Sequence, residues 1–140
     1  MQRFPVTFET NGTQPLKETF QVPWWVDLTW SVSPKVASSG HTEEEALFPE
    51  VIEQYVDFSA DLYLKFVVQS EADFTTVDRY VKLYTERIGR QLKVYIMPEG
   101  GTPSEYMKHS TLDLVAEAVK RGYNITPRLQ VLVGANLTGW

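Results

Sequence analysis

Short polar segments follow four of the strands that the sequence predicts, and they carry the residue types best suited to hold a small ligand. Carboxylate, lysine, amide and glycine residues occur in residues 9–13, 33–35, 97–100 and 134–136. Since the carboxyl ends of parallel strands meet at one edge of a sheet, where α/β folds bind ligands, these segments are expected to lie together. Each segment alone is also typical of a turn, but four of them at one edge favour a binding site.

The chemistry of these segments suits a polar, zwitterionic ligand. Glu99 can accept hydrogen bonds from an ammonium group or a ribose hydroxyl, and Gly100 with Gly101 lets the backbone approach a ligand closely. The predicted helix that begins after Thr102 would offer its first N–H groups to a carboxylate. Lys35 could pair with the same carboxylate, although a solvated lysine beside a turn explains it equally well.

The other ionisable residues form no recognisable catalytic pattern. Lys65 lies inside the apolar segment 62–68, where an unpaired ammonium group is costly. It is therefore expected to reach Glu9 or a ligand, unless the strand is less buried than its composition indicates. His41 and His109 lack the spacing of a metal site, so both are predicted to be ordinary surface residues.

The composition is that of an ordinary globular domain, and it excludes several classes of function. The chain has 140 residues, 43% hydrophobic and 22% charged, with a net charge of −5, so one domain over residues 1–140 is expected. The acidic balance argues against a nucleic-acid partner. No apolar run approaches the roughly 18 residues of a membrane span. Without a signal-peptide pattern at the start, a cytoplasmic location is expected.

The order of hydrophobic patterns predicts an α/β fold with about five mainly parallel strands and crossover helices. Strands are expected at residues 6–8, 26–32, 62–68, 92–96 and 128–133. The continuous apolar run at 62–68 is typical of a strand buried on both faces. A capping-box pattern predicts a helix after Thr42, which Pro49 would kink or delay. The spacing of apolar residues predicts further helices at 74–88 and, as one long helix, at 102–122.

Five segments match a known family in their order and spacing: residues 6–13, 33–35, 64–68, 94–100 and 126–129. With them, nearly the whole chain resembles the C-terminal half of 7-carboxy-7-deazaguanine synthase. That family belongs to the radical S-adenosylmethionine enzymes; its members are lyases that form the ring system of the queuosine precursor. The resemblance implies that residues 1–140 form an incomplete version of the radical-enzyme barrel, corresponding to its C-terminal part.

The resemblance also implies roles for particular residues. The implied S-adenosylmethionine-binding residues are Ser33, Pro34, Lys35, Met97, Pro98, Glu99 and Gly100. Gln130 and the carboxylate of Trp140 are the positions that could touch the substrate, 6-carboxy-5,6,7,8-tetrahydropterin. No residue of this chain is implied to be catalytic. Members of the family pair as homodimers.

Two departures from the family limit what the resemblance implies. The family's N-terminal part, with its three-cysteine motif, has no counterpart here, and the chain contains no cysteine. Because a [4Fe–4S] cluster is held by thiolates, the chain is expected to bind no cluster and to be inactive alone. It would hold S-adenosylmethionine weakly or only with a partner. The tail from Gly134 to Trp140 also differs from the family's usual sequence.

The resemblance leaves the function open between three interpretations. The first is a C-terminal fragment or split subunit of such a synthase. The second is a non-catalytic interaction protein that pairs with an intact enzyme or another partner, and the third is an unrelated small α/β binding domain. In the first two, the edge of strand 6–8 would need a cover. A complementary N-terminal chain, a second copy in a homodimer or the linker 14–23 could supply it.

Overall fold

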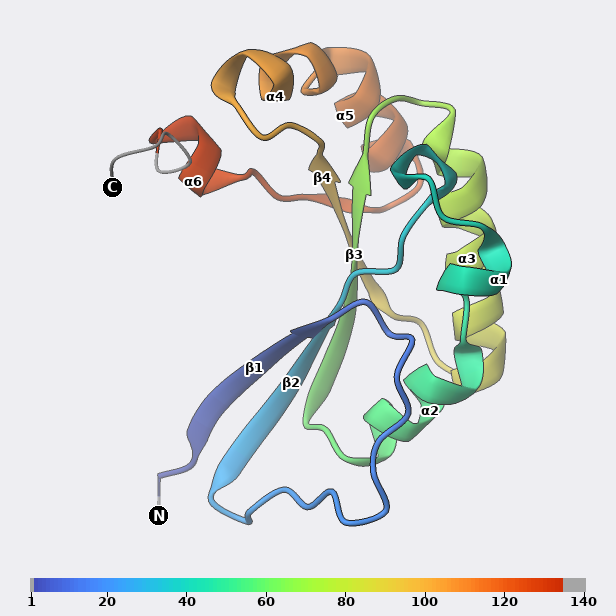
Figure 1. The fold of residues 1–140 in the computed structure, drawn as a ribbon, viewed down its shortest axis with the longest axis vertical. Helices are drawn as coiled ribbons and strands as arrows, with labels where there is room; N and C mark the ends of the chain where they lie inside the picture. Colours follow the sequence, from blue (N-terminus) through green and yellow to red (C-terminus); the bar gives the residue numbers. More distant parts are fainter. Residues whose placement is uncertain (1, 135–140) are drawn as a thin grey trace.

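The computed structural model describes residues 2–134, which form an α/β fold around one open sheet (Figure 1). The strands lie in the order β1-β2-β3-β4-β5, and all neighbours are parallel. Their bounds are Phe4–Thr10 (β1), Val26–Val32 (β2), Asp61–Val68 (β3), Lys93–Pro98 (β4) and Asn124–Ile125 (β5). The expected class, with parallel strands and helices between them, is confirmed. The sheet does not close into a barrel.

Helices follow each strand from β2 onward. Their bounds are Glu43–Ala46 (α1), Pro49–Asp57 (α2), Asp73–Ile88 (α3), Pro103–His109 (α4), Leu112–Lys120 (α5) and Leu129–Leu132 (α6), with a 3₁₀ turn at Ala37–Ser39 (η1). Among residues 2–134, no helix combines the length and the apolar character that a membrane crossing requires.

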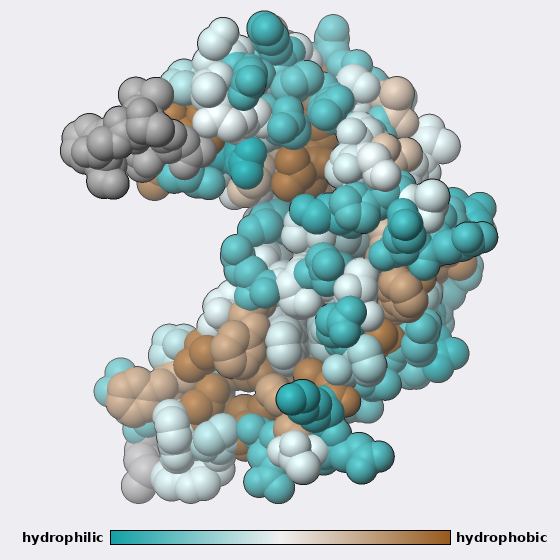
Figure 2. Space-filling model, viewed as in Figure 1, coloured by the Kyte–Doolittle hydropathy of each residue, from teal (hydrophilic) through white to brown (hydrophobic). Residues whose placement is uncertain are grey.

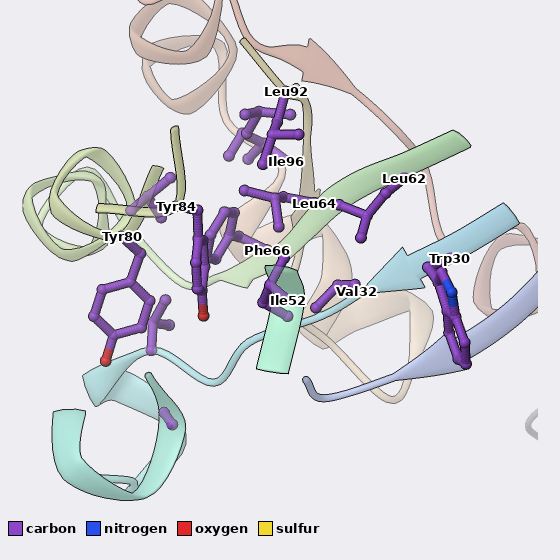
Figure 3. Packing of buried hydrophobic residues seen from close by; sticks show 14 of the residues in the cluster. Trp30, Val32, Ile52, Leu62, Leu64, Phe66, Tyr80, Tyr84, Leu92 and Ile96 are labelled. Carbon is purple, nitrogen blue, oxygen red and sulfur yellow. The ribbon is translucent and has the colours of Figure 1, made fainter. Parts of the chain in front are cut away.

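The hydrophobic core lies on one face of the sheet only. Along β3, the even-numbered residues from Leu62 to Val68 are buried, whereas Tyr63, Lys65 and Val67 are half-buried on the opposite face. The prediction of a strand buried on both faces is therefore wrong. Helices α2, α3 and α5 all pack into the same core, and Figure 3 shows Ile52, Phe66 and Tyr84 meeting there. The opposite face of the sheet is on the concave side of the molecule.

Two predicted helices are each divided in the structure. The helix after Thr42 has the expected capping box but ends at Ala46. A second helix, α2, begins at Pro49, which occupies its first turn. The interruption expected at Pro49 is therefore confirmed. The single helix predicted at 102–122 is wrong. It is split into α4 and α5 because the Thr111 side chain accepts a hydrogen bond from the backbone N–H of Leu114, which starts a new helix.

The predicted last strand, 128–133, is also wrong. The fifth strand is the two-residue β5, and residues 129–132 form α6. Leu129, Val131 and Val133 alternate along this segment, yet only Val131 is buried. Pro127 lacks an N–H group for a continuing ladder, and the chain leaves the sheet there.

A charged cluster joins α3 to the end of α5. The Arg121 Nε lies 2.8 Å from an Asp78 carboxylate oxygen, and the Tyr123 hydroxyl donates to the other oxygen at 2.6 Å. The guanidinium also lies 4.7 Å from the centre of the Phe74 ring and contacts Glu117. Asp78 on α3 thus binds both Arg121 at the end of α5 and Tyr123 just before β5.

Arg121→Ala is expected to lower the free energy of unfolding by roughly 1.5 kcal/mol, because hydrogen bonds to a charged group and a cation–π contact are lost together. Urea denaturation of the purified protein measures the change. Lys120→Ala is the matched control: this side chain is 75% exposed, so its removal should change the free energy by less than about 0.5 kcal/mol. Equal losses in the two variants would contradict the expected role of Arg121.

Candidate functional site

Two adjoining hollows open at the carboxyl ends of β1 to β4. Figure 2 shows the concave side of the molecule, which lies between β1 and α6 in the same view of Figure 1. The larger hollow has a volume of about 720 Å³ and is lined by residues that include Glu9, Asn11, Lys65, Met97 and Gln130. The smaller hollow has a volume of about 200 Å³ and is lined by residues that include Pro34, Ser38, Gln69 and Glu99. Both hollows share Ser33, Lys35, Val67 and Arg128.

The structure brings together most, but not all, of the predicted ligand-binding residues. Ser33, Pro34, Lys35, Met97, Glu99 and Gln130 line one or both hollows. Pro98 and Gly100 are buried and do not line either hollow. Trp140 lies outside the described residues. Four of the residues expected after strands, Glu9, Thr10, Met97 and Pro98, are in fact the last residues of β1 and β4.

Lys65 forms the ion pair with Glu9 that its position in an apolar strand suggested. The Lys65 Nζ lies 2.7 Å from a Glu9 carboxylate oxygen, and the lysine side chain is only 17% exposed. Because β2 lies between β1 and β3 in the sheet, this pair crosses two strand spacings, or about 10 Å. It does so on the face that carries Ser31, whose buried hydroxyl has no hydrogen-bond partner among the described residues.

Glu99 is held in place by its backbone and approached by a histidine. Its N–H donates to the carbonyl of Val68 at 2.8 Å. The Nδ1 of His109 lies 2.8 Å from the Gln69 carbonyl oxygen, to which it donates, and the Nε2 lies 3.5 Å from a Glu99 carboxylate oxygen. His109 is thus part of the site's support, although it was predicted to be an ordinary surface residue. His109 and Gln69 are far apart in the sequence, and no sequence pattern indicated that they would be in contact.

The segment between β4 and α4 is fixed by a glycine and by a capping box. Gly100 has a φ of +146°, and a Cβ built on it would lie 2.3 Å from the backbone nitrogen of Tyr106, so only glycine fits. The Glu105 carboxylate accepts hydrogen bonds from the backbone N–H groups of Gly101 and Thr102, each at 3.1 Å. These bonds lower the pKa of Glu105. Two backbone donors just before α4 are therefore already engaged within the chain, while the expected binding of a ligand carboxylate by the first N–H groups of α4 stays a prediction.

Arg128 is the functional candidate that sequence reasoning missed. Its Nη1 donates to the Gly100 carbonyl at 2.8 Å, which ties the C-terminal segment to the β4–α4 connection. Its Nε is buried and has no hydrogen-bond partner among the described residues. The residue lay within a recognised segment, but it was placed at the start of a strand, where its side chain had no defined role.

Metal binding finds no support in the described part of the chain, where no three His, Asp or Glu residues are grouped to hold an ion. With no cysteine in the sequence, these residues do not fit a [4Fe–4S] cluster. The chemistry that the site can offer is the binding of a polar ligand by lysine, arginine, carboxylate, hydroxyl and amide groups.

Comparison with known proteins identified a distant relative of this chain. No protein-family model matches the chain, and no solved structure matches it. The chain is 31% identical over 134 residues to a 7-carboxy-7-deazaguanine synthase of Pyrobaculum aerophilum. The alignment covers 96% of this chain and 54% of the relative, so the chain spans about half the length of the curated relative that it matches. This supports a distant relationship to that family.

Proposed function

We propose that this chain is the C-terminal, ligand-binding part of an enzyme resembling 7-carboxy-7-deazaguanine synthase, with a surface for S-adenosylmethionine but no cluster of its own. The thiolates for an iron–sulfur cluster would come from a polypeptide other than these 140 residues. The distant relative supports the proposal because the similarity extends over 96% of the chain.

One structural observation carries the proposal. Lys35, which follows β2, and Glu99, which follows β4, line the same small hollow together with Ser33. A cation, a carboxylate and a hydroxyl at the carboxyl edge of a parallel sheet suit a ligand that has an amino acid group and ribose hydroxyls. Glu99 can accept from the ammonium or the ribose, and Lys35 can pair with the carboxylate. The side chains of Glu99 and Lys35, to which these two roles are assigned, therefore line the same smaller hollow.

S-adenosylmethionine is expected to bind this chain alone with a dissociation constant no better than roughly 1 mM, about −4 kcal/mol, since the cluster ligands and much of the pocket wall are absent from this chain. A titration followed by backbone amide shifts measures this binding. Glu99→Gln and Lys35→Gln should each weaken it by roughly tenfold, or 1.4 kcal/mol. Lys82→Gln is the control, because that side chain lies on α3 and is 74% exposed.

A different result would favour the second interpretation, a non-catalytic interaction protein. If saturating S-adenosylmethionine moves no amide near Ser33, Lys35 or Glu99, the cofactor surface is not functional. The alternative has its own support in aromatic side chains beside β1: Phe4 and Trp24 are each 63% exposed. Such exposed apolar groups are typical of protein interfaces. A neighbouring reading frame that encodes a three-cysteine motif would favour the split enzyme instead.

A further inference from the structure

The larger hollow gathers positive charge in a chain that is acidic overall. Lys35, Lys65 and Arg128 come from three separate segments and all line it, with Glu9 as the one carboxylate among its lining residues. The local balance is therefore +2, whereas the whole chain has a formal charge of −5. Like charges converge in this way at a cost, which a bound anion offsets.

Two of these three cations lack an acidic partner. Lys65 is neutralised by Glu9 at 2.7 Å. Lys35 forms no ion pair within residues 2–134, and Arg128 contacts only a backbone carbonyl there, with its Nε buried and unpartnered. A partly buried guanidinium without a counter-ion is unfavourable in the free protein, and this applies to Arg128. Lys35 is exposed and adds a second positive charge beside the same space. The nearest carboxylate besides Glu9 among the lining residues is Glu99, which lies in the adjoining smaller hollow.

We propose that the larger hollow is an anion-binding site in which Lys35 and Arg128 together hold a carboxylate or phosphate group of the ligand. Guanidinium and ammonium groups both form strong charge-assisted hydrogen bonds to such oxygens. The amides of Asn11 and Gln130 line the same hollow and can bind the polar remainder of the ligand. This inference deepens the proposed function and rests on it for placing a ligand at this edge.

The site can be tested with two simple anions, inorganic phosphate and malonate, each titrated at low ionic strength into the uniformly labelled chain. Both are expected to shift the backbone amides of residues 33–36 and 126–130 in a saturable way. Lys35→Gln and Arg128→Gln should each raise the dissociation constant at least fivefold, and Lys82→Gln should leave it unchanged. Tighter binding of malonate than of phosphate agrees with the carboxylate of the proposed ligand, whereas tighter binding of phosphate supports the anion site and counts against the proposed function.

The outcomes separate this inference from the proposed function. Saturable anion binding that depends on Lys35, without any binding of S-adenosylmethionine, supports the anion site and counts against the proposed function. Binding of S-adenosylmethionine with no saturable anion shifts, or with anion shifts that Lys35→Gln leaves intact, overturns the anion site. Since Arg128 also ties down the Gly100 carbonyl, a thermal melt checks that variant's fold, and the exposed Lys35 decides the result if Arg128→Gln unfolds.

Discussion

Replacing Gly100 with alanine is expected to lower the free energy of unfolding by about 3 kcal/mol and to abolish the proposed ligand binding at the adjoining hollows. The φ of +146° is strained for any residue with a Cβ. The new methyl group would also lie 2.3 Å from the backbone nitrogen and 2.4 Å from the Cα of Tyr106. Backbone atoms in the first turns of a helix cannot move aside alone, so α4 must shift, and with it the Gly100 carbonyl that positions Arg128.

Gly101→Ala is the matched control for this change. A Cβ there meets only the end of the Glu105 side chain, at an ordinary 3.5 Å, and the backbone N–H that donates to Glu105 is retained. The expected change is within about 0.5 kcal/mol. Thermal and urea denaturation of the two variants, side by side, measure the difference. Equal stability of the Gly100 and Gly101 variants would show that the β4–α4 segment is not constrained as the structure indicates.

The second large expected effect follows from the proposed function: catalysis should require a partner polypeptide. After anaerobic reconstitution with iron and sulfide, the chain alone is expected to show no iron–sulfur absorbance and no turnover of 6-carboxy-5,6,7,8-tetrahydropterin, because no thiolate is present in its sequence. Addition of a polypeptide matching the other half of the relative, with the three-cysteine motif, is expected to bring both. Absorbance spectroscopy and product analysis by mass spectrometry are the measurements.

The same polypeptide with its three cysteines changed to serine is the control for this experiment. It should still associate with the chain if the two halves share a sheet, yet restore no turnover. A stoichiometric cluster bound by the chain alone would overturn the expectation. Association without turnover by the cysteine-containing polypeptide would favour the non-catalytic interaction protein.

Local patterns predicted the elements in which one physical signal dominates. The alternation at Val26–Val32 gave β2 with its bounds, and the 3.6-residue spacing that ends at Gly89 gave α3. The prediction failed where two signals competed. Residues 129–133 alternate like a strand, but Pro127 and the anchoring of Arg128 to Gly100 direct this segment away from the sheet. The sequence of this segment alone does not reveal the contact between Arg128 and Gly100.

The candidate site was predictable to the extent that it depends on strand ends. Ser33, Lys35 and Glu99 lie together because parallel strands bring their carboxyl ends to one edge. The contribution of Arg128 could not be predicted, because it depends on how residues 128–133, predicted as a strand, leave the sheet and contact the Gly100 carbonyl. His109 was missed for a related reason, since the contact with Glu99 depends on α4 ending there instead of continuing to residue 122.

The strand order has a consequence for synthesis on the ribosome. Every strand in the described part of the chain pairs with its neighbours in sequence, with no later strand inserted between earlier ones. A nascent chain can therefore add each strand and its covering helix to an edge that already exists. For the same reason, a chain of this topology can be divided between two strands without parting more than one pair of neighbours. A gene that encodes such a sheet tolerates a break at a strand boundary better than one in which distant strands interleave.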